Sequence, residues 1–400
     1  MFYVRRFRSS NQKRLSTLVI GIFLVSLLTP VISAQADGVT WRKVNPSCSC
    51  SYIASSSDGS KLIAAVSTGQ ILTSTNYGAT WTPRDSVRYW GAVASSSDGT
   101  KLVGVVIEGQ IYTSTDSGAS WTARDSVRRW SGIASSSDGT KLVATFEGGQ
   151  IYTSTDSGAS WTARDSARQW TSVASSSDGT KLVATARDDQ IFTSSDSGAT
   201  WIPRDSRRLW RAVASSSDGS QLAAVVYGNP GNIFTSNDSG TTWIQRAPDL
   251  NKYWQGIAMS SDGKKLVASS YMGTVYTSKD SGATWTSGEA VRDAYGVAAS
   301  ANGDIFVAAA PGYIYTTAPL PKSSQNPIPK GSVKAIKVST KKYTLTISSN
   351  APNTKYTITA TKKGAKTLTF LGTTKANGSA IRTIAQNLFG YKFMLKLGAK

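Results

Sequence analysis

The chain has 400 residues, of which 44 are basic and 24 acidic, and it holds two cysteines and no histidine. Two cysteines are too few for a disulfide-stapled scaffold, and one C-x-C pair without histidine argues against a zinc site. The formal net charge of +20 sits at the chain ends: residues 1–36 hold 5 basic residues, residues 321–400 hold 15, and neither segment holds an acid. We therefore expect no metal and no cofactor. Without an aromatic RNA-binding motif or a glycine-rich phosphate loop, we also expect no specific nucleic-acid recognition.

The first 36 residues have the pattern of a secretory signal peptide. Basic residues are followed by an apolar run from Leu18 to Leu28 and by Ala34-Gln35-Ala36, a small-x-small cleavage site. The apolar run is about half the roughly 20 residues that a membrane-spanning helix needs. An uncleaved anchor is the alternative, and a twin-arginine signal at Arg5-Arg6 is a weaker one. We expect a mature protein that starts near Asp37 and is secreted or associated with the cell surface.

Cys48 and Cys50 follow soon after the predicted cleavage site. A bridge between them is possible in an oxidising exterior, but its geometry would be tight. Two free thiols or an intermolecular link are the favoured alternatives.

The middle of the chain is a repeat. Close copies of Ile151 to Trp170 recur at steps of 40 or 42 residues. A second marker, an SSSDG-like turn, alternates with the first; its acidic residues are Asp58, Asp98, Asp138, Asp178, Asp218 and Asp262, with Asn302 closing the series. Two turn signals per copy, each flanked by β-branched and aromatic runs, are typical of the four-stranded blades of a β-propeller.

One copy, from Trp130 to Trp161, predicts four strands. The run 131–137 of small residues suits an innermost strand beside a central channel, and Asp138-Gly139 makes a tight turn. Residues 141–146 and 150–156 follow as a second and a third strand, joined by a hairpin at Gly148-Gly149. A turn at 156–160 leads to an outermost strand, 160–165.

The turn before the outermost strand has the sequence S-x-D-x-G-x-[ST]-W. Its carboxylate can accept backbone N–H groups, its glycine can take a positive φ, and its tryptophan can cover the hairpin. The full pattern recurs at Asp116, Asp156, Asp196, Asp238 and Asp280. It resembles the Asp-box, or bacterial neuraminidase repeat, over residues 38 to 317. The resemblance implies that these aspartates are structural and lie on the face away from any active site.

Six complete copies end at Trp81, Trp121, Trp161, Trp201, Trp243 and Trp285, and a seventh stops at Pro319 without an outermost strand. The segment Gly38-Val39-Thr40-Trp41 matches Gly198-Ala199-Thr200-Trp201 and can supply that strand. We predict an all-β fold: a seven-bladed propeller over residues 37–318, closed by the N-terminal strand, which removes the exposed sheet edge of an open array.

Each outermost strand leads into a connection rich in arginine and tryptophan, on the face opposite the aspartate turns. Its members are Arg84, Arg124, Arg164 and Arg204, then Arg88, Arg128, Arg168 and Arg208, then Trp90, Trp130, Trp170 and Trp210. Arginine beside tryptophan suits carboxylates, phosphates or an acidic loop of a partner. These twelve residues are the predicted ligand-binding arc. The alternative is that Arg124 pairs with Asp125 and packs on Trp130 for structural reasons only.

Asp-box propellers include sialidases, so a secreted glycoside hydrolase is the alternative function. The carboxylates expected near the loop face are few, and they are Glu108, Glu147, Asp188, Asp189, Glu289 and Asp293. The sialidase-type R-I-P triplet is missing before the first copy, and near-identical copies do not favour a single catalytic constellation. We therefore assign no catalytic residue. Among non-catalytic relatives, the repeat type and blade count resemble the photosystem II stability/assembly factor family, which implies a docking platform for other polypeptides.

The C-terminal fifth has a different character. Residues 319–331 form a linker rich in proline, serine and lysine, and residues 332–400 contain six or seven short alternating runs that suggest an immunoglobulin-like or fibronectin-like sandwich. A module without acidic residues is attracted to polyanions, although a solvated basic surface without a ligand is equally compatible. The sequence thus favours a monomeric, exported, non-catalytic propeller that binds a protein or an anionic polysaccharide of the cell envelope.

Overall fold

In the computed structural model of this chain, residues 39–319 are described apart from 45–47, 229–230, 248–249, 251 and the side chains of 289–290. The backbone of six strands between 331 and 397 is also described. The predicted signal peptide, residues 1–36, and residues 320–330 of the predicted linker lie outside the described residues. Within the described residues, no helix is long and apolar enough to span a bilayer.

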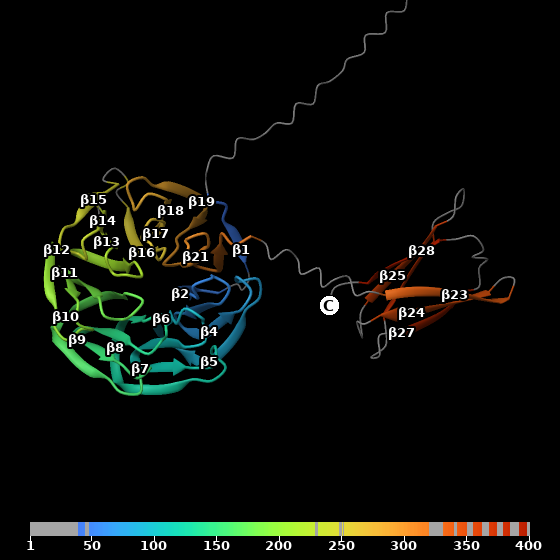
Figure 1. The fold of residues 1–400 in the computed structure, drawn as a ribbon, viewed down its shortest axis with the longest axis horizontal. Helices are drawn as coiled ribbons and strands as arrows, with labels where there is room; N and C mark the ends of the chain where they lie inside the picture. Colours follow the sequence, from blue (N-terminus) through green and yellow to red (C-terminus); the bar gives the residue numbers. More distant parts are fainter. Residues whose placement is uncertain are drawn as a thin grey trace, which may run out of the picture. The chain divides into compact units, whose positions relative to one another are not determined.

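The strands of residues 39–319 pair antiparallel, in sheets that follow the repeat. One sheet holds β2 (Cys50–Ser55), β3 (Leu62–Val66), β4 (Gly69–Ser74) and β5 (Thr82–Arg88), in that order. Another holds β16 (Tyr253–Met259), β17 (Leu266–Tyr271), β18 (Thr274–Ser278) and β19 (Thr286–Arg292). In Figure 1 the sheets are arranged around a centre, with β2 and β16 near it and β5, β15 and β19 on the outside.

Ten strands pair in one sheet over the middle copies, and the longer ones each join two strands of the repeat. The ten are β6 (Trp90–Ser95), β7 (Leu102–Ser114), β8 (Thr122–Ser135), β9 (Leu142–Ser154), β10 (Thr162–Ser175), β11 (Leu182–Ser194), β12 (Ile202–Ser215), β13 (Leu222–Val226), β14 (Ile233–Ser236) and β15 (Ile244–Arg246). The first half of β10 pairs with β9 as an outermost strand, and its second half pairs with β11 as an innermost strand. The chain therefore passes from the rim of one copy to the centre of the next without a long loop.

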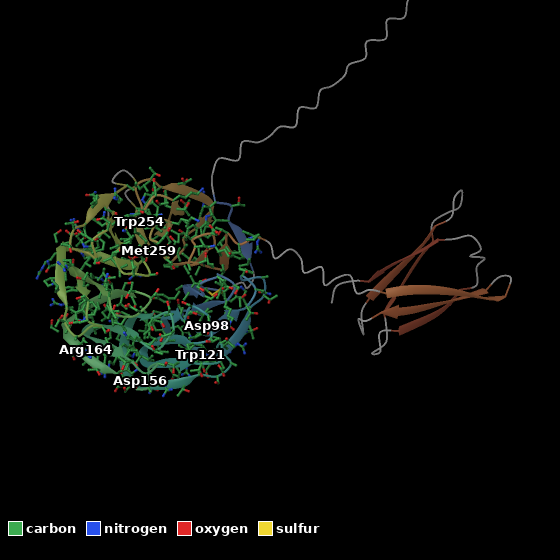
Figure 2. The ribbon with its side chains drawn as sticks, in the orientation of Figure 1. Asp98, Trp121, Asp156, Arg164, Trp254 and Met259 are labelled. Atoms are coloured by element: carbon green, nitrogen blue, oxygen red, sulfur yellow. A yellow bond between two sulfur atoms is a disulfide. The ribbon has the colours of Figure 1, made fainter. Side chains whose placement is uncertain are left out.

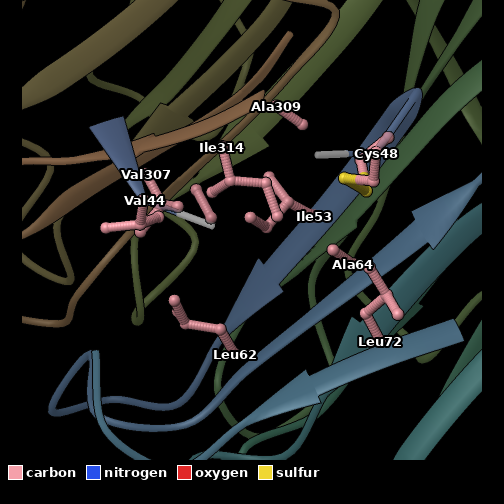
Figure 3. Close-up of a cluster of buried hydrophobic side chains, with 11 residues drawn as sticks. Val44, Cys48, Ile53, Leu62, Ala64, Leu72, Val307, Ala309 and Ile314 are labelled. Carbon is pink, nitrogen blue, oxygen red and sulfur yellow. A yellow bond between two sulfur atoms is a disulfide. The ribbon is translucent and has the colours of Figure 1, made fainter. Parts of the chain in front are cut away.

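The two ends of the repeat region share one sheet. Strand β1 (Arg42–Val44) pairs with β22 (Tyr313–Thr316), which pairs with β21 (Phe306–Ala310) and then β20 (Gly296–Ala299). The N-terminal segment thus supplies the outermost strand that the last copy lacks, as expected. Figure 3 shows the apolar cluster at this junction, where Val44, Val307 and Ile314 pack against Ile53 and Leu62 from the first copy.

Cys48 and Cys50 form a disulfide in this junction, with Cα atoms 5.2 Å apart. The expectation of free thiols or an intermolecular link was therefore wrong. The reason is that this Cα separation lies within the range that a disulfide spans without backbone movement.

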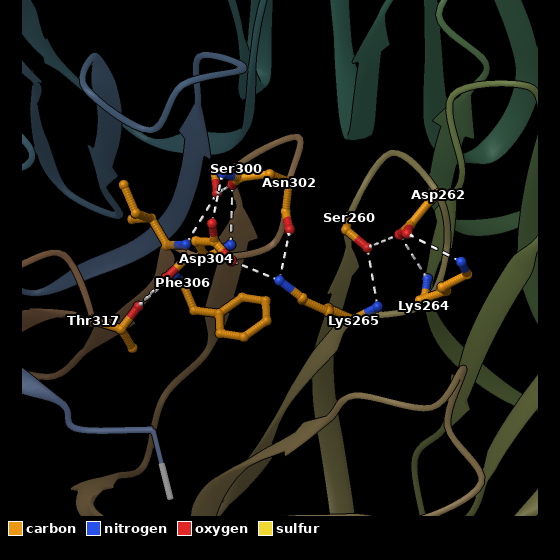
Figure 4. Close-up of polar contacts among 10 residues, drawn as sticks. Ser260, Asp262, Lys264, Lys265, Ser300, Asn302, Asp304, Phe306 and Thr317 are labelled. Atoms are coloured by element: carbon orange, nitrogen blue, oxygen red, sulfur yellow. Dashed lines mark hydrogen bonds and ion pairs between the residues drawn. The ribbon is translucent and has the colours of Figure 1, made fainter. Parts of the chain in front are cut away.

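A closed circuit of backbone hydrogen bonds joins the tight turns after the innermost strands. In each turn one N–H donates to the carbonyl of the equivalent residue in the next copy, at 2.7–2.8 Å. The circuit runs through Ser57, Ser97, Ser137, Ser177, Ser217, Ser261 and Ala301, and returns to Ser57. Neighbouring turns are also linked by side chains, as where Lys265 Nζ donates to Asn302 O at 3.0 Å and to Asp304 Oδ1 at 2.6 Å (Figure 4). No turn in the circuit lacks a neighbour on either side.

The turn before each outermost strand is organised by one carboxylate. Asp156 Oδ1 accepts from Ser154 Oγ at 2.8 Å and from the Ser160 N–H at 2.9 Å. Gly158, at φ +86°, donates its N–H to Ser154 Oγ and accepts the Trp161 indole N–H on its carbonyl. Similar bonds recur around Asp116, Asp196, Asp238 and Asp280. The Ser160 hydroxyl, which donates to Asp156 Oδ2, favours the ionised form most, and together with the Ser160 N–H and the Ser154 hydroxyl it holds the pKa of Asp156 at about 2.

The six described C-terminal strands fall among the six or seven alternating runs that the sequence predicts. They are β23 (Gly331–Ser339), β24 (Lys342–Ser349), β25 (Lys355–Thr361), β26 (Leu368–Thr373), β27 (Ser379–Ile384) and β28 (Lys392–Leu397). They make two three-stranded sheets, ordered β23-β24-β27 and β26-β25-β28.

Candidate functional site

The ring has two different ends. At one end, here the turn face, the turns of Asp98 and Asp116 lie together, since the Ser117 N–H donates to Thr100 O at 2.9 Å. At the other end, the loop face, the hairpin between the second and third strands meets the connection between copies, since the Ile107 N–H donates to Tyr89 O at 2.8 Å. This division matches the prediction, but the predicted binding residues do not all lie at the loop face.

The first row of arginines lies toward the turn face. Each Nε donates to a threonine Oγ1 on the neighbouring third strand at 2.9–3.1 Å, through the pairs Arg84–Thr73, Arg124–Thr113, Arg164–Thr153, Arg204–Thr193 and Arg246–Thr235. The Arg84 stem also lies against Gly118, in the turn of the next copy. Figure 2 places Arg164 and Asp156 in the outer part of the ring. The prediction that the first-row arginines lie beside the second row at the loop face was therefore wrong.

The second row of arginines does lie at the loop face, but these side chains are engaged. Each forms an ion pair with the aspartate three residues earlier, at 2.9 Å for Arg88–Asp85 and 3.5–3.6 Å for Arg128–Asp125, Arg168–Asp165 and Arg208–Asp205. Each guanidinium also stacks over a ring of the third strand, with Cζ 4.0–4.5 Å from the centroids of Tyr112, Tyr152, Phe192 and Phe234. The pairing expected of Arg124 is thus made by the second row instead. Ligand binding by either row stays a prediction.

The tryptophans of the predicted arc are core residues. Trp90, Trp130, Trp170 and Trp210 are at most 1% exposed, and each packs edge-on against the aromatic ring beneath an arginine of the second row. Their rings therefore cannot form the ligand-binding surface that the sequence suggested. The physical reason is that a large apolar ring at the start of an innermost strand is stabilised most by burial between copies.

The register also identifies the residues that take the place of these tryptophans in the first and last copies. Cys50 pairs with Val66 as Trp90 pairs with Val106. Cys50, and not Tyr52, therefore occupies the tryptophan position. By the same spacing Ala294, and not Tyr295, occupies it in the last copy. Tyr52 and Tyr295 line the cavity described next, and Tyr52 also packs against the buried cluster that contains Trp90.

The loop face opens into a central cavity of about 750 Å³. Its rim carries Tyr89, Arg129 and Gln169 from the connections between copies, and Glu108, Glu147 and Arg187 from the hairpins. Its wall is formed by the residue after each tryptophan position, and further down each strand an isoleucine or valine lines it, for example Ile133. The volume is that of a typical ligand pocket.

The cavity lining is where the copies of the repeat differ. The position before the tryptophan is Tyr89, Arg129, Gln169, Leu209 and Tyr253 in successive copies. The position after it is Gly91, Ser131, Thr171, Arg211 and Gln255. By contrast, the turn bonds described above recur with little change, and the arginine–aspartate pairs recur in four successive copies. The asymmetry of the molecule is therefore concentrated at the channel mouth.

The charged groups of the cavity are partly paired. Arg129 Nε lies 3.3 Å from Glu147 Oε2, while Arg211 Nε donates to the neutral Gln255 Oε1 at 3.2 Å. Burial raises the pKa of the Tyr52 hydroxyl, and the positive charge of Arg211 partly opposes that rise. A tyrosine and an arginine thus line the same cavity.

Comparison with solved structures identifies the architecture. YCF48 from Cyanidioschyzon merolae matches at 16% identity with a TM-score of 0.56, over 69% of this chain and 98% of that one. The fold is a β-propeller. YCF48 bound to D1 peptide matches at 16% identity and a TM-score of 0.55, over 69% of this chain and 95% of that one. No family model and no curated protein matches the sequence.

A glycoside hydrolase also shares the propeller fold. The GH74 xyloglucanase from Xanthomonas campestris matches at 13% identity with a TM-score of 0.58, over 77% of this chain and 59% of that one. At these identities the likeness shows the fold alone.

The carboxylates of the propeller's loop face differ in their surroundings. Asp189 accepts from Arg168 Nη1 at 2.9 Å and lies 3.8 Å from Arg207 Nε, so it belongs to the ion-pair network of the rim. Glu108 and Glu147 line the cavity. Among the described residues, no group of three or more histidine, cysteine, aspartate or glutamate side chains could hold a metal ion.

The sequence analysis did not predict the residues of this cavity, because it relied on residues that recur from copy to copy. The wall residues directly follow each tryptophan, and equivalent positions there hold Ser131, Thr171 and Arg211. A comparison of the copies position by position would have found them. A position whose residue differs among equivalent strands is one where the fold does not require a particular residue.

Proposed function

We propose that this chain is an exported, non-catalytic propeller that docks a polypeptide partner in its loop-face cavity. The propeller has seven blades and is closed by its N-terminal strand. The basic C-terminal strands form an immunoglobulin-like or fibronectin-like module that retains the protein at an anionic cell surface. Export rests on the signal-peptide pattern of residues 1–36, and retention rests on the 15 basic residues of residues 321–400.

One observation carries the proposal: the otherwise repeated blades differ where they line the cavity. A fold built from equivalent blades needs the same structural residues in each, and this chain keeps its turns almost unchanged and its arginine–aspartate pairs in four successive blades. The residues that fit a particular partner must instead differ from blade to blade, because the partner does not have the symmetry of the ring. Tyr89, Arg129 and Gln169 occupy one such position on the rim.

The chemistry of the cavity favours a polypeptide. Tyr52, Tyr89 and Tyr295 line it, and tyrosine combines apolar contact area with a hydroxyl at a low entropic cost, as in other protein-binding surfaces. Arginines and glutamate on the rim offer both signs of charge. A solved propeller with the same architecture, YCF48, is bound to D1 peptide, which supports the use of this fold for peptide docking.

The test is retention of envelope polypeptides on the immobilised mature protein. We expect the double variant Tyr89→Ala, Gln169→Ala to lose the retained polypeptide, because both side chains lie on the cavity rim. The matched control is Arg164→Ala, which removes a side chain near the turn face. Equal retention by all three proteins would contradict the cavity as the docking site.

A secreted glycoside hydrolase is the second candidate, and two carboxylates in the cavity favour it. Glycosidases generally use a pair of Asp or Glu residues, and Glu108 and Glu147 line the same space. The ion pair of Glu147 with Arg129 counts against a free pair. Turnover of fluorogenic glycosides or plant-wall oligosaccharides, abolished by Glu108→Gln or Glu147→Gln, would establish the enzyme and displace the scaffold proposal.

A further inference from the structure

The wall position of the cavity carries a single charge. In successive blades this position is Ser51, Gly91, Ser131, Thr171, Arg211, Gln255 and Tyr295, all of them described residues that line the cavity. Most are small or neutral. Arg211 is the one cation in the series.

The fold does not require an arginine there. Strand β12 pairs with β13 through Trp210↔Val226 and Ala212↔Val225, with a register shift at the residue between them. The neighbouring blade has the same shift around Thr171, and another has it around Gly91. The same register shift at the start of the innermost strand therefore forms with a glycine or a threonine at this position.

The surroundings of Arg211 leave its charge without a counter-ion. Its Nε donates to Gln255 Oε1 at 3.2 Å, and no carboxylate among the described residues lies within ion-pair distance of its guanidinium. The side chain is half-buried in the cavity. A partly desolvated cation without a partner costs free energy that a bound anion would offset.

We propose that Arg211 binds a carboxylate of the polypeptide docked in the cavity, either its C-terminal carboxylate or an Asp or Glu side chain. The Nη groups can form the two parallel N–H···O bonds that suit a carboxylate, while Nε stays fixed by Gln255. Tyr52 lines the same cavity and supplies a hydroxyl that can donate to the bound peptide. This inference rests on the proposed function, because it names the group that the cavity recognises.

The experiment uses the mature protein and a library of degenerate short peptides with free C-termini. Peptides retained by the wild type are resynthesised with amidated C-termini, and with Asn or Gln in place of Asp or Glu. We expect the variant Arg211→Gln to bind the free peptides about 10- to 100-fold more weakly, as for a lost charge-assisted hydrogen bond. Removing the responsible carboxylate should weaken wild-type binding by a similar factor and leave Arg211→Gln almost unaffected.

The matched control is Arg207→Gln, a more exposed arginine on the same strand that does not line the cavity. It should bind as the wild type does, and the thermal midpoint of Arg211→Gln should be no lower than that of the wild type. If the peptides bind wild type and Arg211→Gln equally, the inference is wrong while the docking function stands. If the wild type retains no peptide, or binds uronic-acid oligosaccharides instead, the polypeptide proposal and this inference both fall.

Discussion

The turn face and the loop face of this propeller are built by opposite strategies. The turn face repeats one solution: a carboxylate that collects hydroxyl and N–H donors, as at Asp156, and a backbone bond to the next blade, as at Ser137. The loop face varies, and its cavity wall changes from Gly91 to Arg211 while the strand register stays the same.

The difference teaches where each kind of constraint lies. Buried backbone groups must be paired in every blade, so the residues that pair them recur. Residues that face solvent or a ligand carry no such obligation, so they can change without loss of the fold. Repetition therefore marks the structure of this molecule, and departure from repetition marks its candidate site.

The largest loss of stability should come from a buried tryptophan. Trp130→Ala removes a ring that is 1% exposed and packs on Phe146 and Tyr152 at centroid distances of 5.8 and 5.6 Å. We expect a fall of about 3–5 kcal/mol in the free energy of unfolding, measured by chemical denaturation. Trp130→Phe is the control and should lose less, since the indole N–H has no hydrogen-bond partner among the described residues. A loss below that of a surface substitution would place the ring outside the core after all.

Replacing a second-row arginine should lower the stability of the fold, because these side chains are held in ion pairs and ring contacts. Arg168→Ala leaves Asp165 without its cation, leaves Asp189 only its longer contact with Arg207, and uncovers Phe192. Because the group is partly exposed, we expect about 1–3 kcal/mol in the free energy of unfolding. Arg207→Ala, which is 77% exposed, should change it by less than about 0.5 kcal/mol. An Arg168→Ala protein with full stability but no ligand binding would restore the predicted binding arc.

A turn aspartate should have a smaller effect. Asp156→Ala deletes acceptors for Ser154, Ser160 and the Ser160 N–H, and we expect a loss of about 1 kcal/mol. Asp156→Asn should cost less, because Asn76 stands at the equivalent position and its Oδ1 accepts from Thr80 N at 2.9 Å. Thermal melts of the two variants test this order. The reverse order would show that charge, and not hydrogen bonding, holds the turn.

The same carboxylate should make stability depend on pH in acid. Its folded pKa of about 2 lies below the ordinary value near 4, so the unfolded chain takes up its proton first as the pH falls. The contribution of Asp156 is therefore present above about pH 4 and is lost as the pH falls toward 2. In urea denaturation over this range, the wild type should lose stability more steeply than Asp156→Asn, whose amide does not titrate. Parallel curves would contradict the lowered pKa.

The sequence predicted the propeller because its evidence is local and repeated. The spacing of the turns and the match of Gly38–Trp41 to Gly198–Trp201 were enough to place β1 beside β22. The disulfide was misjudged because sequence gives no Cα separation for Cys48 and Cys50. This separation depends on the path of the chain between β1, in the sheet that joins the two ends of the repeat, and β2.

The site was harder to predict, because the residue types alone do not show toward which face each side chain points. Arg124 and Arg128 are four residues apart on β8, yet the first bonds to Thr113 toward the turn face and the second pairs with Asp125 at the loop face. Asp125 has a positive φ of 53° at an irregularity in the strand, which breaks the simple alternation of side chains. Without that backbone detail, the two arginines and Trp130 look like one surface.

The smallest effect should come from exchanging residues of the cavity rim. Tyr89 and Gln169 occupy equivalent positions before Trp90 and Trp170, and both are exposed. The exchange Tyr89→Gln, Gln169→Tyr keeps the composition and should change the free energy of unfolding by less than about 0.5 kcal/mol. It moves the tyrosine around the ring, so the peptides that the cavity retains should change in sequence. Unchanged stability with an unchanged set of peptides would mean that the rim is merely tolerant of variation, and the variation would then no longer mark a site.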